Sequence, residues 1–434
     1  MILDLNRPRR VCERWRIAIG LVLALVWVTP AAHAQRLAQL SWWDRSPERK
    51  LGNYWIKSDL PSGQTEAIAR HLNAMYAEYH KRMASLPVRV QEKLNVLLFK
   101  EREDYSLTLR ARFGVNADAS GGMFFANTAG TALAIWTGGL PQRRIDHVLQ
   151  HEAFHQFAYS RFGDDLPIWL NEGLAELFGE ALLVDGTLII GQATPPLLEE
   201  VQTAIDANKH LPFEQMLNIT PAQWNAALKH ESASPAYRQA WSMVHFLIYA
   251  NEGQYAGAFE NYLRHLNNGL PSKQAFVRSF GPDIAAFEAQ WKRYVMEARP
   301  SALATALERI EFLAEGALEL NRRKIHPQSL EELKSALREI NFTFTQKSHA
   351  VEVVHSADDD RAFAIPMDAL CAQQPVYAVS KSRLNQSSRR EAMLEQVNPT
   401  PPAITTEHLR PMGLQVKWVR DLEANTFSYQ IVIR

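Results

Sequence analysis

The five residues His151-Glu152-Ala153-Phe154-His155 lie in a stretch, 143–161, whose apolar residues recur with the period of a helix. Side chains four residues apart share one helix face, so both imidazoles can reach a single metal ion. Glu152 then lies beside an open coordination position, where a carboxylate can act on water activated by zinc. A five-residue pattern of this kind arises by chance in roughly a few per cent of chains of this length, so the surrounding sequence has to support it.

A candidate third ligand, Glu172, follows seventeen residues after His155. It belongs to a second helical segment with the sequence Trp-Leu-Asn-Glu-Gly-Leu-Ala-Glu, 169–176, and a short reversal at 161–166 lets this helix run back beside the first. Three protein ligands and one open position are typical of catalytic zinc. Glu176, one turn further on the same face, is expected to receive the free ring N–H of a ligand histidine. The alternative is two solvated glutamates on an ordinary helix.

His147 precedes His151 by one helical turn and is a further candidate. The drift of the helix face and the need for an open coordination position argue against a fourth protein ligand. We therefore expect His147 to be either solvated or a supporting residue behind the ligands.

Residues 1–34 have the pattern of a secretory signal peptide. Five arginines between positions 7 and 16 precede an apolar run, 17–28, and Ala32-His33-Ala34 supplies a small-residue cleavage site. The apolar run is too short for a comfortable membrane span, which disfavours an uncleaved anchor. We expect cleavage before Gln35, a periplasmic or secreted location, and no stable membrane insertion after cleavage.

The composition of the mature chain excludes one class of partner. Removal of the five arginines with Asp4 and Glu13 leaves 42 basic and 45 acidic residues, so no basic surplus points to nucleic acid. Cys371 is then the only thiol, and no intramolecular disulfide can form. No sequence feature indicates the oligomeric state.

The length of 434 residues exceeds what one hydrophobic core usually organises, and the elements indicate an α+β fold. We expect a metal-binding domain at 35–299, with a small N-terminal α/β part and a mostly helical C-terminal part, followed by a small α+β domain at 300–434. The first part should contain a helix at 64–83, a strand at 94–99 and a hairpin formed by 121–125 and 131–136. The later helices are expected at 143–161, 167–183, 196–208, 235–250, 255–266 and 283–297. In the second domain we expect a hairpin at 414–419 and 427–433, and a long loop at 385–405.

With these motifs, the chain resembles the peptidase MA-like gluzincins, zinc metallopeptidases, and most closely their poorly characterised secreted bacterial members. The resemblance covers about 54–296. In the related aminopeptidase N-type family, the glutamate of the Asn-Glu-Gly stretch is the third ligand, which corresponds to Glu172, and the glutamate of the histidine motif is the base, which corresponds to Glu152. A downstream tyrosine in that family donates to the oxyanion, and segment 236–244 is similar to that region. The resemblance thus implies Tyr237 as the oxyanion donor, although a structural tyrosine at a helix start is the alternative.

One departure from the aminopeptidases bears on the type of cleavage. Their Gly-x-Met-Glu-Asn segment carries a glutamate that binds the amino terminus of the substrate. The nearest equivalent here is Gly-Gly-Met-Phe-Phe, 121–125, in which phenylalanine replaces that acid. We therefore expect an endopeptidase rather than an exopeptidase, with an extended peptide paired to this strand.

These features predict a zinc metallopeptidase in which Zn²⁺ is held by His151, His155 and Glu172, and which acts on a peptide or protein substrate. Two alternatives remain open from the sequence. One is a zinc-containing binding module of the cell envelope that catalyses nothing, and the other is a hydrolase of a non-peptide amide. An intact Glu152 disfavours the binding module, because a purely structural zinc site needs no base and closes its fourth position.

Overall fold

The computed structural model describes Trp43 and residues 47–118, 120–228, 233–347, 352–368, 370–382 and 389–434. Residues 46–434 form one compact unit of mixed helix and sheet, in agreement with the expected fold class. The predicted signal peptide lies outside the described residues. Among the helices that are described, none is both long enough and apolar enough to cross a bilayer.

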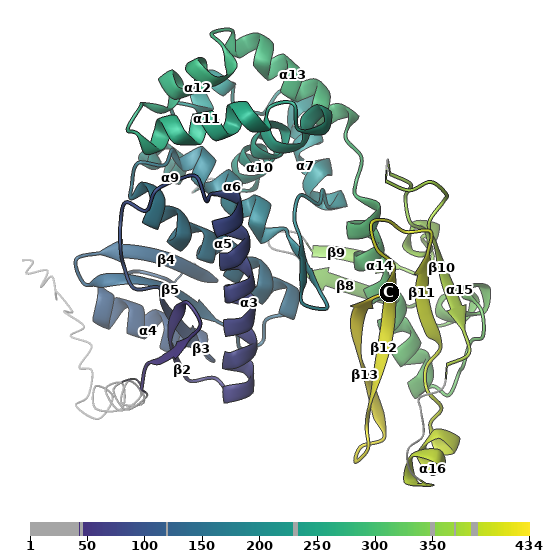
Figure 1. Ribbon diagram of the computed structural model, residues 1–434. Helices are drawn as coiled ribbons and strands as arrows, with labels where there is room; N and C mark the ends of the chain where they lie inside the picture. The colour runs from purple at the N-terminus through teal and green to yellow at the C-terminus, as the bar shows by residue number, and fades with distance from the viewer. Residues whose placement is uncertain are drawn as a thin grey trace, which may run out of the picture. The chain divides into compact units, whose positions relative to one another are not determined.

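The N-terminal part is built on a five-stranded sheet with the strand order β1-β2-β3-β5-β4 (Figure 1). Strand β3 is parallel to β2 and β5, whereas β1 and β4 run antiparallel to their neighbours. Strand β4 therefore forms one edge of the sheet. The predicted strand and hairpin are confirmed; the strands are β1 (Arg49–Leu51), β2 (Tyr54–Ser58), β3 (Asn95–Phe99), β4 (Gly122–Asn127) and β5 (Gly130–Trp136).

Alternation of side chains along β3 gives this sheet two apolar faces. Val96 and Leu98 belong to the large core that also contains buried residues of α3 (Ser62–Arg82) and α5 (Gln142–Phe162). Phe99 instead packs against Tyr105 of α4 (Arg102–Phe113), with ring centroids 5.8 Å apart. Because successive strand residues point to opposite faces, α5 and α4 lie on different sides of the sheet.

Helices dominate the chain from α5 onward and share that same core. Helix α6 (Ile168–Gly179) packs between α5 and α10 (Ala233–Tyr249) and is buried on almost every side. The remaining elements of this part are α7 (Pro195–Asp206), α8 (Phe213–Met216), α9 (Pro221–Leu228), η1 (Ala250–Gly253), α11 (Ala256–Asn267), α12 (Ser272–Phe280) and α13 (Ile284–Glu297).

Helix α6 is shorter than the sequence predicted. The expected helix 167–183 ends at Gly179, and a hairpin of β6 (Leu182–Val184) and β7 (Thr187–Ile189) follows. Asp185 and Gly186 link the two strands with φ angles of +50° and +77°. Two successive positive φ angles define the turn that suits a two-residue hairpin, and Asp-Gly is a favoured sequence for it. This signal outweighs the helical period of the apolar residues before it.

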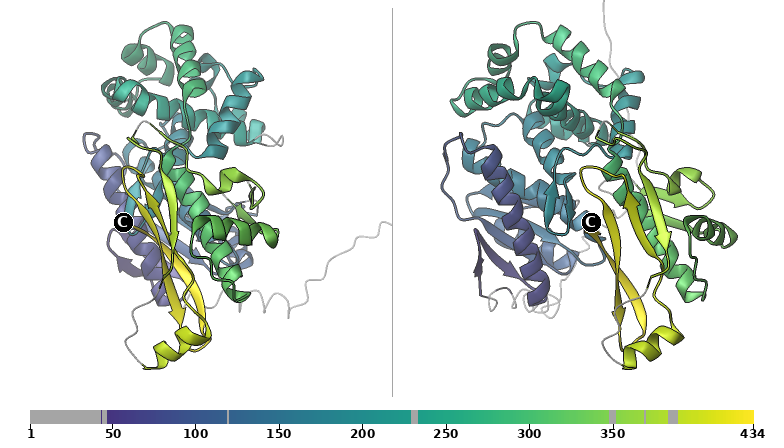
Figure 2. Two further views of the ribbon diagram at one scale, coloured as in Figure 1. Left: turned by 90° about the vertical axis from the view of Figure 1, so that its right-hand side faces the viewer. Right: turned by 45° about the vertical axis from the view of Figure 1, so that its right-hand side comes forward.

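A second apolar core forms in the C-terminal part around α14 (Ala302–Arg322) and a four-stranded antiparallel sheet of order β10-β11-β12-β13. Leu182 and Val184 of β6 also belong to this core. Figure 2 shows the long β12–β13 hairpin in yellow, which confirms the predicted hairpin. The expected domain boundary near residue 300 remains a prediction. The elements are α15 (Leu330–Glu339), β8 (Thr343–Lys347), β9 (Glu352–Ser356), η2 (Asp360–Phe363), β10 (Val376–Ser380), β11 (Ala403–Glu407), β12 (Leu414–Asp421) and β13 (Thr426–Ile433).

The predicted long loop at 385–405 is wrong for much of its described part. Helix α16 (Arg389–Val397) occupies nine of these residues, and β11 begins at Ala403. The polar composition of the segment indicated a loop. However, α16 buries none of its own residues, so a polar sequence is compatible with it, and β11 forms because it pairs with β10.

The close approach of α6 to α10 leads to a prediction about Gly173. A Cβ atom at this position would lie 2.5 Å from the backbone oxygen of Ala240. We expect Gly173→Ala to lower the free energy of unfolding by about 1–3 kcal/mol, because overpacking forces the two helices apart. Chemical denaturation measures this change. Gly257→Ala is the control, since Gly257 is a helical glycine with open space around it and should gain about 0.5–1 kcal/mol. Equal stability of Gly173→Ala and wild type would contradict the tight packing.

Candidate metal centre

A sharp turn brings the two helices with the candidate ligands together. Helix α5 ends at Phe162, and Gly163 follows with φ +59° and ψ −132°, a conformation that side chains disfavour. Pro167 is the N-cap of α6, and its carbonyl oxygen accepts hydrogen bonds from the N–H groups of Leu170 and Asn171. The chain thus reverses within five residues, and the face of α6 that carries Glu172 lies against the histidine face of α5.

His151, His155 and Glu172 form one group of potential ligands, with the three ligand atoms within 4.8 Å of one another. Glu172 Oε2 lies 3.3 Å from His151 Nε2 and 3.5 Å from His155 Nε2. Ligand atoms around a tetrahedral zinc ion lie roughly 3.4 Å apart, since each bond is about 2.0–2.1 Å long. Glu172 Oε2 is also buried between the two imidazoles. The donor set of two imidazoles and one carboxylate, its spacing and this buried oxygen all fit zinc.

The electrostatics of the group favour positive charge. Burial by itself raises the pKa of Glu172, but the two imidazoles lower it to about 2. Burial likewise lowers the pKa of His151, yet the carboxylates of Glu172 and Glu176 bring it well above its usual value. The carboxylates therefore stabilise a cation between the two helices.

The Nδ1 atom of each candidate histidine ligand faces a side chain of α6. His155 Nδ1 lies 3.1 Å from Asn171 Oδ1, and His151 Nδ1 lies 3.3 Å from Glu176 Oε1. Such partners fix the tautomer and the ring orientation, so that Nε2 is directed to the metal position. The structure thus places Glu176 where the sequence analysis expected it. Asn171 was missed, although it directly precedes Glu172 in the same motif.

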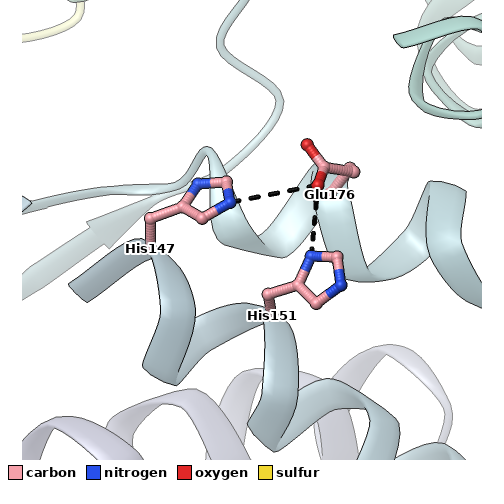
Figure 3. A group of neighbouring side chains, drawn as sticks. All are labelled: His147, His151 and Glu176. Atoms are coloured by element: carbon pink, nitrogen blue, oxygen red, sulfur yellow. Dashed lines mark ion pairs between the residues drawn. The ribbon is translucent and has the colours of Figure 1, made fainter. Parts of the chain in front are cut away.

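His147 lies behind these ligands and is buried, which excludes the solvated alternative. Figure 3 shows His147 and His151 on α5 facing Glu176 from the same side. His147 Nε2 lies 3.9 Å from Glu176 Oε1, and His147 Nδ1 lies 3.6 Å from Glu180 Oε1. A Cβ at Gly179 would approach the His147 ring to 3.0 Å, so this glycine leaves space for the imidazole.

Glu152 lies on the cleft side of the group. Its Oε2 accepts a hydrogen bond of 2.7 Å from the backbone N–H of Phe124 on the edge strand β4. Burial raises the pKa of this carboxyl, with the two neighbouring histidines acting in the opposite direction. The Glu152 carboxylate is therefore held against the edge strand of the sheet.

A cleft of about 1120 Å³ opens over this group. Glu152, His151, His155 and Glu172 line it, together with Tyr237 of α10. The ring centroids of Tyr237 and His151 are 6.3 Å apart. The remaining lining residues come mainly from the edge strand, the turn between α5 and α6, and an apolar wall; examples are Met123, Ala126, Asp164, Asp165, Ile219, Leu266 and Leu270. The structure thus brings all the residues implied for catalysis to one cleft.

Two charged residues that the sequence analysis did not identify extend the group away from the cleft. Arg238 of α10 donates a 2.9 Å hydrogen bond through Nη1 to Glu176 Oε2 and lies 3.9 Å from Glu180 Oε1. Burial raises the pKa of Glu180 to about 7, although Arg238 acts to lower it. The available signal was the spacing of four residues between Glu172, Glu176 and Glu180, which predicts one continuous acidic face on an apolar helix.

The raised pKa of Glu180 predicts a pH-dependent stability. The folded state keeps the proton up to about pH 7, whereas the unfolded carboxyl releases it near its usual value of 4.5, so stability falls as the pH rises through this window. Glu180→Gln should match wild type below this window and exceed it by up to about 3 kcal/mol above pH 7. Urea denaturation of both proteins across this pH range measures the difference. A difference that does not change with pH would contradict the buried, protonated carboxyl.

Comparison with known proteins gives one match that includes this group. A family model described as "Protein of unknown function (DUF1570)" matches residues 146–268. This segment begins just before His151 and extends beyond Tyr237, so it contains every candidate site residue named above for the cleft except those of β4 and of the chain beyond 268. A search of the curated proteins found no match to the chain.

Proposed function

We propose that this protein is a zinc-dependent metallopeptidase of the gluzincin type, and that it cleaves within peptide chains. The observation that carries the proposal is the position of Glu152. Its carboxylate is held by the N–H of Phe124 at the wall of a cleft that also contains the two imidazoles and the carboxylate of the ligand group. A base next to a three-ligand zinc site is what hydrolysis requires.

His151, His155 and Glu172 would hold the ion, and a zinc ion bound there supplies Lewis acidity and lowers the pKa of water. Glu152 takes a proton from the attacking water and delivers it to the nitrogen of the leaving group. The hydrogen bond from Phe124 keeps the Glu152 carboxylate in one orientation during both transfers. Asn171 and Glu176 hold the imidazoles in the tautomer that is protonated on Nδ1, so that the Nε2 lone pair can bind the metal.

Tyr237 is the proposed donor to the oxyanion of the tetrahedral intermediate. It lines the cleft beside the ligand group, and burial raises the pKa of its phenol. A raised pKa keeps the hydroxyl protonated, which a hydrogen-bond donor needs. The half-buried position of the ring against Trp224, with centroids 5.2 Å apart, fixes where that hydroxyl can point.

Two features support cleavage inside a chain. In the described part of the sheet β4 pairs only with β5, so backbone groups on its other edge, apart from the Phe124 N–H that donates to Glu152, could pair with an extended peptide. Phe124 stands where the aminopeptidases carry the glutamate that binds the amino terminus of the substrate. The substrate class we propose is therefore a peptide or protein bound along β4. Export through the signal sequence at 1–34 would place this activity in the periplasm or outside the cell.

The first test concerns the ligands. We predict that His155→Ala loses its one equivalent of zinc after dialysis, because two remaining ligands hold the ion poorly. Metal analysis of the purified full chain measures the content. His147→Ala is the matched control: it removes a buried histidine from the same helix but should retain one equivalent. Retention of zinc in His155→Ala would contradict the ligand assignment.

The second test concerns the base. We predict that Glu152→Gln retains zinc and fold while peptide hydrolysis falls by at least about a hundred-fold, because glutamine cannot accept the proton. A peptide-library digest with and without a chelator measures the activity. Glu319→Gln changes a partly exposed glutamate of α14 that pairs with Arg322 and Arg323, and it should be fully active. A wild type with full zinc and no cleavage of any peptide would favour the binding module or the hydrolase of another amide, and an unchanged rate in Glu152→Gln would exclude this residue as the base.

A further inference from the structure

Arg238 is almost completely buried, with 4% of its side chain exposed, yet it lies outside the cleft. Its guanidinium donates to Glu176 Oε2 at 2.9 Å through Nη1 and to Glu200 Oε2 at 3.1 Å through Nε. Glu176 is fully buried, whereas the Glu200 side chain is 32% exposed. Arg238 therefore joins a completely buried carboxylate to one at the protein surface.

The two oxygens of Glu176 serve different partners. Oε2 accepts from Arg238, while Oε1 lies 3.3 Å from His151 Nδ1. A buried carboxylate without a cation is costly, and its side chain could rotate away from the imidazole. The planar guanidinium holds two acceptors in fixed directions, so it determines which way Glu176 Oε1 points. Arg238 thus acts on His151 only through Glu176.

The same surroundings argue against a second metal ion at this place. His147, His151 and Glu176 do form a second group of potential ligands, all of them buried. However, the guanidinium already supplies positive charge to Glu176, and a metal on His151 Nδ1 would require that imidazole to lose both ring protons if Nε2 binds zinc as well. A hydrogen bond from His151 Nδ1 to Glu176 keeps the proton on Nδ1 and leaves Arg238 as the cation beside Glu176.

We propose that Arg238 is a positioning residue of the zinc site: by holding Glu176 against His151, it sets the affinity of the site for zinc. This inference rests on the proposed function, since it assumes that His151, His155 and Glu172 bind the ion. It adds a residue from a third helix, α10, to the two helices that carry the ligands and their partners.

The test is the zinc affinity of the full-length mature chain, measured by competition with a chromophoric chelator and independent of any activity. We expect Arg238→Met to weaken zinc binding about 10- to 100-fold, the usual effect of losing an outer partner of a metal ligand. Arg238→Lys keeps the positive charge but lacks the planar guanidinium with its several N–H donors, so it should recover part of that loss. The control is Arg420→Met, which removes an arginine that is 5% exposed and pairs with Glu395 in the C-terminal part. It should lower stability without changing zinc affinity.

A double-mutant cycle separates positioning from a general loss of structure. Glu176→Met removes both carboxylate oxygens and keeps the side-chain length. If Arg238 acts through Glu176, then Arg238→Met in the Glu176→Met background should change zinc affinity by less than about twofold. Should Arg238→Met fail to fold, Arg238→Lys takes its place in the cycle.

The outcomes are distinguishable. A wild type that binds no zinc removes the proposed function and this inference together. A wild type that binds one equivalent, with unchanged affinity in Arg238→Met, overturns the inference alone. Equal losses from Arg238→Met with and without Glu176 would show an effect that bypasses Glu176 and would also overturn it. Two equivalents of zinc in wild type, of which one is lost in His147→Ala, would replace it with a second metal site.

Discussion

Helix α6 and its C-cap residue carry three carboxylates, Glu172, Glu176 and Glu180, spaced four residues apart in the interior of the protein. Burial of a charged carboxylate costs several kcal/mol unless a neighbouring cation or hydrogen-bond donor compensates the charge or the group keeps its proton. The compensation differs among the three: Glu172 faces the imidazoles of His151 and His155, Glu176 faces those of His147 and His151 together with Arg238, and Glu180 keeps its proton up to about pH 7. The imidazoles of α5 and the guanidinium of Arg238 on α10 thus compensate the carboxylates of α6.

The packing that surrounds α6 makes this electrostatic arrangement possible. Gly173, between two of the carboxylates in sequence, lets the backbone of α10 approach closely, and Gly179 leaves room for the ring of His147. Both glycines bring a cation or an imidazole to the acidic face. On the other side of α5, the sheet contributes through its edge strand, where the N–H of Phe124 holds Glu152. The proposed ligands, the proposed base and the residues that hold them thus come from four elements, three helices and one strand.

The sequence allowed the local part of this picture to be predicted. The period of apolar residues located α5 within one residue at each end, and the motif placed His151, His155 and Glu152 on it. The downstream motif indicated Glu172 and Glu176, and the structure brings both to the histidines. The predicted element boundaries were wrong where a turn sequence or pairing with a distant strand outweighed the local periodicity and composition. The Asp-Gly turn ended α6 before the predicted residue, and α16 and β11 formed inside a segment of loop-like composition.

Which residues share a helix face can be read from the order of the amino acids alone, because it depends only on the helical period and on residues a few positions apart. The residue types that can bind zinc or transfer a proton are also evident there. The contacts of Arg238 with Glu176, 62 residues away, and of Phe124 with Glu152, 28 residues away, arise only when the chain folds. An arginine in an apolar helix does not reveal its partner, and a backbone N–H carries no sequence signal at all. These contacts depend on how α10 and β4 pack against α5 and α6, which is set by burial of the common core.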